Sequence, residues 1–158
     1  MTKKLDLSLS EAELEDFLAS ERTVRVASVD AGCRPHVVPL WFVWLEGAMY
    51  LNSTLGNVTV ENLLRGSGLA AAVVDDGQTY DVLRGVLLRG RVSLANDDPR
   101  VPRARQAWSD KYLAGNPVPY DRWLNRVWMR LDPGEISSWD FRKIPEAKAR
   151  QRGSEGAS

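Results

Sequence analysis

The side chains that most often perform chemistry are sparse in this sequence and form no recognised catalytic pattern. His36 is the only histidine, so no cluster of histidines is available for a metal ion. Its place beside Pro35 in an expected strand predicts a hydrogen-bonded or partly exposed structural residue rather than a proton donor. Cys33, the single cysteine, falls in an expected turn. No serine occupies a nucleophile elbow, no pair of carboxylates is spaced for hydrolysis, and the Asp-Asp-Gly string at 75–77 indicates a turn. We therefore predict no catalytic side chain.

The composition predicts one ordinary globular domain. The 158 residues are 44% hydrophobic and 27% charged with a formal net charge of zero, so no overall field attracts nucleic acid or an anionic membrane. The single cysteine fits a reducing cytoplasm. The first ten residues lack the apolar core of a signal peptide, and no run approaches the roughly 18 apolar residues that span a bilayer. We expect a cytoplasmic protein without nucleic-acid or membrane partners.

Residue patterning over 1–143 predicts a domain made mainly of antiparallel strands. Strand signals cover 23–30, 35–45, 48–53, 69–74, 80–95, 126–132 and 136–140. Helical signals cover 10–20, 57–65 and about 100–114, the first opening with a capping box of Ser10 and Glu13. A loop at 116–120 and one helical turn near 121–125 precede the last strands. The fold class is mainly β with α-helices: a closed or half-closed barrel of six or seven strands with two or three flanking helices. Residues 144–158 lack periodicity and are expected to form a disordered tail.

Several residues inside the strand signals mark irregular positions. Pro39 cannot donate a backbone hydrogen bond, which predicts a strand edge or a bulge where backbone groups could face a ligand. Gly85 and Gly90 predict bulges or sharp coiling at barrel corners. Trp41 and Trp44 are three residues apart, so a regular strand places them on opposite faces. One of them can line a pocket while the other meets the core or a partner.

Four strings, in this order and spacing, resemble the pyridoxamine 5'-phosphate oxidase-like split-barrel superfamily, and within it the actinobacterial flavin/deazaflavin oxidoreductases. They are PHVVP at 35–39 with WF at 41–42, NLLR at 62–65, TYDVLRGV at 79–86 and SWDFRK at 138–143. The resemblance covers residues from about 10 to 143. It implies an FMN-binding type of split β-barrel.

The resemblance also implies a homodimer with two equivalent grooves at the subunit interface. Each groove would hold coenzyme F-420 (a deazaflavin) or, as the second choice, FMN, with its phosphate after the third strand. A helix beginning near Asn57 offers free N–H groups and a positive dipole end there. The implied function is hydride transfer between this cofactor and a small unsaturated or aromatic substrate, and the cofactor carries that chemistry. The expected cofactor-binding residues are Pro39, Trp41, Asn52, Thr54, Asn57, Thr59, Asn62, Arg65 and Arg84, and the expected substrate-binding residues are Tyr80 and Trp139.

The sequence departs from the family pattern where the phosphate is expected. The lysine that the family usually has three residues before its Asn-Leu pair is Thr59 here, and Glu61 is acidic. Charge-assisted contacts are roughly twice as strong as neutral ones, so Arg65, Arg84 or Arg89 of either subunit would have to compensate. The alternative is therefore a split-barrel protein without a cofactor, which binds a ligand or partner and has no redox activity. A heme-binding relative is a third interpretation, which the lone histidine weakens.

Overall fold

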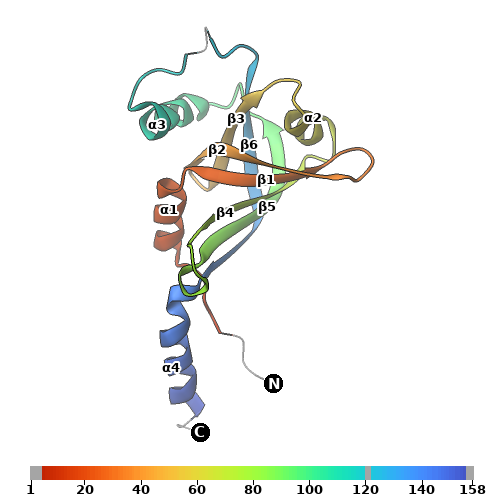
Figure 1. Cartoon of the computed structure of the whole chain (residues 1–158). Coiled ribbons are helices and arrows are strands. Elements are labelled where there is room, and N and C mark those ends of the chain that lie inside the picture. Colours follow the sequence, from red (N-terminus) through yellow and green to blue (C-terminus); the bar gives the residue numbers. More distant parts are fainter. Residues whose placement is uncertain (1–4, 120–121, 156–158) are drawn as a thin grey trace.

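Six antiparallel strands form one closed barrel in the part of the chain that the structure describes. This computed structural model describes residues 5–119 and 122–155. The strands follow the order β1-β2-β3-β6-β5-β4 around the barrel (Figure 1). The fold class predicted from the sequence, a mainly β split barrel with flanking helices, is confirmed. The strands are β1 (Thr23–Val29), β2 (Pro35–Leu45), β3 (Ala48–Thr54), β4 (Leu69–Asp76), β5 (Arg84–Leu94) and β6 (Arg126–Asp140).

Helices flank the barrel and complete two hydrophobic clusters. The barrel interior contains alternate residues of the strands, such as Val24, Val26 and Phe42, together with the apolar faces of α1 and α2. The second cluster lies between α3 and the outer face of the sheet, where Trp108 packs near Trp128. The helices are α1 (Glu11–Ser20), α2 (Val58–Arg65), α3 (Val101–Leu113) and α4 (Ile144–Glu155), with 3-10 turns η1 (Tyr80–Val82) and η2 (Phe141–Lys143). The capping box predicted for the first helix is present.

The last strand differs from its prediction. The two strands expected at 126–132 and 136–140 are one continuous strand, β6. A bulge makes this continuity possible, because the register shifts between Arg89 and Gly90 where β6 passes through Pro133 and Gly134. The irregularity expected at Gly90 is thus confirmed. The strand expected over 80–95 begins later, at the first residue of β5, because residues 80–82 form η1.

The segment after residue 143 also differs from its prediction. Where a disordered tail was expected, residues 144–155 form α4, which extends away from the barrel (Figure 1). Its sequence, IPEAKARQRGSE, has a proline in the first turn, where proline is favoured, and is rich in strong helix formers. The helix has no continuous apolar face, so periodicity could not reveal it. Residues 120 and 121, on which the predicted loop and helical turn partly fall, lie outside the described residues, as do 156–158.

Among the described helices, none has the length and apolar character that crossing a bilayer requires.

Candidate functional site

One edge of β2 is only partly paired with its neighbouring strand. Residues 35–41 of β2 pair with β1 on one side. On the other side, pairing with β3 begins only at Phe42, opposite Leu51. The first half of β2 and the end of β1 therefore form an arm, the hairpin on the right of Figure 1, whose outer edge has no strand partner in the described ranges. Pro39 lies in this free edge, which confirms the edge position predicted for a residue without an N–H.

The N-terminus of α2 lies directly after β3. Asn57 is the N-cap: its Oδ1 accepts a hydrogen bond from the Val60 N–H at 2.9 Å, and its Nδ2 donates to Ser53 Oγ at 2.7 Å. The N–H groups of Val58 and Thr59 have no acceptor within the helix, because they belong to its first turn. These donors and the helix dipole create a local positive potential that favours an anion.

Polar side chains join α2 to the arm. His36 Nε2 lies 3.1 Å from Thr59 Oγ1, and Asn62 Nδ2 donates to Ser28 Oγ at 3.2 Å. Thr59 and Ser28 are buried, so these groups hold the helix against the arm. The hydrogen-bonded position predicted for His36 is confirmed. Its proximity to Thr59 was not predicted, because only the chain's tertiary path brings β2 against α2.

The side chain of Asn52 offers no free donor to a phosphate. Its side chain is buried on β3, and its Nδ2 donates a long hydrogen bond of 3.5 Å to the carbonyl of Val127. Because a carbonyl oxygen can only accept, the NH2 group of Asn52 faces Val127, and Oδ1 of Asn52 faces away from it. Within the described ranges, Asn52 Oδ1 is enclosed and has no hydrogen-bond partner. Thr54, two residues further along β3, is exposed near α2.

Trp41 ends the free edge and packs beneath α3. Its ring stacks on Tyr112 with centroids 4.4 Å apart and lies 6.1 Å from Trp108. Trp41 remains 40% exposed, so part of its ring can still contact a ligand. Trp44 points to the opposite side of β2, where its Nε1 donates to Glu15 Oε1 at 2.8 Å. The opposite orientations predicted for the two tryptophans are confirmed.

The hydroxyl of Tyr112 fixes α3 to β2. It accepts a hydrogen bond from the Phe42 N–H at 3.0 Å and lies 2.7 Å from the carbonyl oxygens of Arg22 and Phe42. Burial raises the pKa of Tyr112 to about 12, so the phenol stays protonated at neutral pH and can donate to one of these carbonyls. The half-buried, neutral hydroxyl of Tyr112 therefore holds in place the ring on which Trp41 stacks.

Asp98 anchors the start of α3 to the outer face of the sheet. Arg100 donates to both oxygens of its carboxylate at 2.9 Å, Arg130 donates at 3.3 Å, and the Tyr50 hydroxyl donates at 3.4 Å. The side-chain and backbone hydrogen bonds from Arg100 hold the pKa of Asp98 well below its ordinary value. The carboxylate is therefore ionised at neutral pH and ties α3 to β3 and β6.

We expect Asp98→Asn to lower the free energy of unfolding by about 1–2 kcal/mol, because charged hydrogen bonds are lost. Since the folded-state pKa is lowered, the stabilisation is present above the unfolded pKa of about 4 and is lost as the pH falls below it. Urea unfolding at several pH values should show a weaker acid dependence in this variant. Asp97→Asn, at an exposed neighbouring carboxylate, is the control. Equal acid dependence in both variants would contradict this role.

The expected arginines lie away from the N-terminus of α2. Arg65 lies at the other end of α2, where it pairs with Glu61 at 2.9 Å. Arg84 pairs with Asp76 at 3.1 Å, and its guanidinium lies 4.7 Å from the Phe17 ring centroid of α1. A third cation, Arg89, pairs with Glu135 at 2.8 Å. Within one subunit, none of these three arginines adds an unpaired charge to the α2 terminus.

The two residues expected to bind substrate also lie near the start of β5, where Arg84 is. Tyr80 is 70% exposed and packs against Phe141 of η2, with ring centroids 4.9 Å apart. Trp139 covers Gly85, where a Cβ atom would come within 2.3 Å of the indole ring. The glycine therefore lets the strand accept a large ring. The structure does not bring Tyr80 and Trp139 to the α2 terminus of their own subunit.

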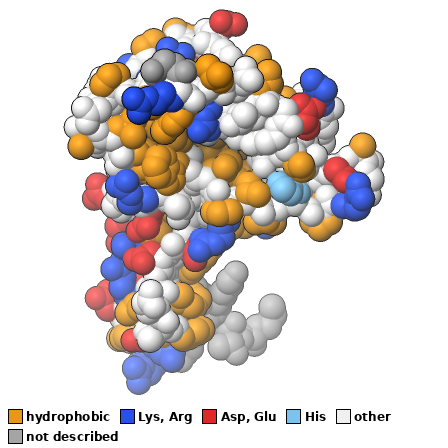
Figure 2. All heavy atoms as spheres, turned by 45° about the horizontal axis from the view of Figure 1, so that its top comes forward, with side chains coloured by type: hydrophobic (Ala, Val, Ile, Leu, Met, Phe, Trp, Pro, Cys, Tyr) orange, Lys and Arg blue, Asp and Glu red, His pale blue; other side chains and the backbone are white. Residues whose placement is uncertain are grey.

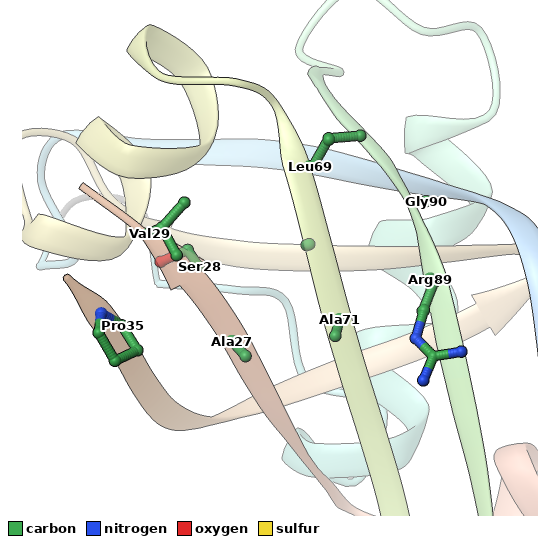
Figure 3. A pocket seen from close by; sticks show the side chains of 9 residues that line it. Ala27, Ser28, Val29, Pro35, Leu69, Ala71, Arg89 and Gly90 are labelled. Carbon is green, nitrogen blue, oxygen red and sulfur yellow. The ribbon is translucent and has the colours of Figure 1, made fainter. Parts of the chain in front are cut away.

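An apolar cavity of about 390 Å³ lies on the outer face of β1, β4 and β5, beside the arm (Figure 3). Its lining includes Ala27, Val29, Leu69 and Ala71, with Arg89 also contributing. Val29 and Leu69 are 40% and 56% exposed. Figure 2 shows further hydrophobic side chains in the middle of one face, to the left of the pale-blue histidine. In contrast, no group of acidic, histidine or cysteine side chains in the described residues could hold a metal ion.

The closed six-stranded antiparallel barrel with flanking helices has the architecture of the split-barrel class. Residues 10–140 match the pyridoxamine 5'-phosphate oxidase family model, and the chain belongs to this family.

Three solved structures illustrate the similarity. A conserved hypothetical protein, Rv2991, from Mycobacterium tuberculosis has a TM-score of 0.79 and 26% identity over 92% of this chain and 93% of that chain. An FAD-binding protein from Mycobacterium smegmatis has a TM-score of 0.64 and 20% identity over 85% and 98% of the two chains. An F-420 reductase has a TM-score of 0.61 and 22% identity over 78% and 94%. A sequence comparison with curated proteins finds no match.

Proposed function

We propose that this chain binds a phosphate-bearing flavin-type cofactor, with coenzyme F-420 favoured over FMN, and transfers hydride to a small unsaturated or aromatic substrate. The observation that carries this proposal is the free edge of β2 beside the capped N-terminus of α2, in a member of this family. Proteins of the same fold that are named as FAD-binding and as an F-420 reductase support it.

The residues present offer places for both parts of such a cofactor. The N–H groups of Val58 and Thr59 would hold the phosphate, helped by the helix dipole. The free backbone groups of the β2 edge and the exposed part of Trp41 would contact the ring system. When bound, the cofactor supplies the hydride chemistry. The chain would orient the cofactor and exclude water from it.

We also propose that the working unit is a homodimer. The arm leaves one strand edge without a partner, and the cavity beside it is apolar. Native proteins rarely leave such an edge or an apolar surface uncovered. A second copy that covers this region would form two equivalent grooves and could bring residues such as Arg84 toward its partner's α2 terminus.

A second candidate function is binding without redox chemistry. The observation that favours it is that Arg65, Arg84 and Arg89, the arginines expected to hold the phosphate, are each paired with a carboxylate of the same subunit. Neutral donors bind phosphate more weakly than cations do. A split-barrel protein of this kind would keep the groove but accept an uncharged ligand or a protein partner.

Titration with coenzyme F-420 and with FMN distinguishes the two functions. Quenching of tryptophan fluorescence should report binding, because Trp41 is partly exposed near the proposed site. We expect saturation in the micromolar range by one of the two cofactors. Riboflavin, which has the ring of FMN without its phosphate, is the control and should bind more weakly than FMN. Failure of both cofactors to bind at about 100 µM, a binding free energy of about −5.5 kcal/mol, would refute cofactor binding.

A further inference from the structure

Helix α4 lacks the packing that normally stabilises a helix of its length. It has 12 residues, and of the side chains described, over 144–153, only Ala147 is buried. Isolated helices shorter than about 12–15 residues are marginal in water. Its main contacts are with η2, at its own N-terminal end. The described side chains after Ala147 are therefore mostly exposed.

The exposed side chains of α4 are mainly basic. Lys148, Arg150 and Arg152 are all exposed. None of them lies within ion-pair distance of a described carboxylate, although the charge of Arg150 acts on Asp6 at longer range. Glu146 is the one acidic side chain described on this helix. A partner surface for α4 should therefore carry unpaired carboxylates.

Helix α1 provides such a surface. Its sequence, EAELEDFLAS, contains four acidic residues and no basic residue. Glu11 and Asp16 are exposed and form no ion pair within the described ranges. Glu13 pairs with Lys143 at 2.6 Å, so its charge is already compensated. The exposed face of α1 is thus complementary in charge to α4.

A cleft of about 330 Å³ lies beside this acidic face. Its lining includes Asp16, Phe17, Arg84 and Arg142. Asp76 neutralises Arg84, and Asp140 pairs with Arg142 at 2.6 Å. Asp16 is therefore an uncompensated charge at the cleft, which gives a long basic side chain both an apolar surface and a carboxylate to contact.

We propose that α4 docks on α1 of a second copy of this chain. Within one subunit, α4 extends away from the barrel beyond α1, and no ion pair links the described side chains of the two helices (Figure 1). A two-fold axis would let each α4 meet the partner's α1, as in an isologous interface. This interface involves α1 and α4 rather than α2 and the free edge of β2, so it goes beyond the proposed function and would add to the proposed homodimer.

Charge reversal tests this docking. The triple variant Lys148→Glu, Arg150→Glu and Arg152→Glu should weaken self-association by at least roughly tenfold, because an exposed ion pair contributes about 0.2–1 kcal/mol and the two-fold axis repeats each pair. Sedimentation equilibrium at low salt should show the assembly mass falling by half within a suitable concentration range. Adding Glu11→Lys and Asp16→Lys to the same chain should restore association, because the charges of both helices are then reversed and the helices attract each other again. Arg122→Glu, at an exposed site off α4, is the control.

Several results would overturn the proposal. A wild-type chain that is monomeric at every concentration would overturn it, and so would an unchanged mass in the triple variant. The third such result is a variant with all five substitutions that is folded by circular dichroism but does not associate. Binding of wild-type chain to phosphatidylglycerol vesicles, with no self-association, would assign α4 to a membrane surface instead. Cofactor titration of the triple variant separates the two proposals, because the α2 terminus is unaltered and its affinity should stay at the wild-type value.

Discussion

Replacing Gly90 with alanine is expected to destabilise the barrel by at least about 3 kcal/mol. A Cβ atom at this position would lie 2.0 Å from the carbonyl oxygen of Asp132 and 2.8 Å from the Cα of Pro133. Both are backbone atoms of β6, so no side-chain rotation can relieve the overlap. The two strands would have to separate at the bulge that lets β6 continue past Pro133. Urea or thermal unfolding measures the effect.

Gly134 offers a matched control on the other side of the same bulge. The nearest atom to a Cβ at this position is the Arg89 carbonyl oxygen at 4.0 Å, so Gly134→Ala meets no obstruction. We expect this variant to stay close to the wild-type stability. If Gly90→Ala were as stable as Gly134→Ala, the close approach of β5 and β6 at the bulge would be wrong.

Replacing Val58 with arginine is expected to tighten binding of a phosphate-bearing cofactor by about ten- to a hundredfold, or about 1.5–3 kcal/mol. Val58 is the first residue of α2 and is 57% exposed, so a guanidinium can be added there without burial. Lysine at the family's usual place, residue 59, would instead replace a buried threonine and its contact with His36. For this reason residue 58, rather than residue 59, is the better position for an added cation.

Fluorescence titration of Val58→Arg with FMN and riboflavin checks this prediction. The gain should appear with FMN and not with riboflavin, and it should shrink as ionic strength rises. Val58→Leu is the uncharged control. A cation near a helix N-terminus opposes the dipole, so the variant should lose roughly 0.3–1 kcal/mol of stability. Equal FMN affinity in wild type and both variants would place the phosphate elsewhere.

Several polar side chains at the candidate site already have structural partners. The polar groups of Asn57, Thr59, Asn62 and His36 are used to cap α2 and to hold it against the arm. The groups left free for a ligand include backbone: the first-turn N–H groups of α2 and the free edge of β2. Backbone donors can position a bound group without acting as acids or bases, and the proposed function asks no more of them.

The sequence by itself determined the features that neighbouring residues encode. The strand signal over 23–30 predicted β1, the Ser10–Glu13 box marked the start of α1, and Asn57 marked the start of α2. Pro39 marked a free edge because a missing N–H is a local property. These signals, with the order of the four family strings, were sufficient for the split-barrel fold.

The tertiary structure alone decided the features that depend on residues far apart in the chain. Whether β6 continues past Pro133 depends on Gly90 in the partner strand. The contact of His36 with Thr59 depends on how α2 lies against the arm, and the distance of Arg84 from that terminus depends on which strands pair. Strand register and helix placement arise from the packing of the whole barrel. For this reason the sequence could predict the helix terminus of the site, but not which side chains surround it.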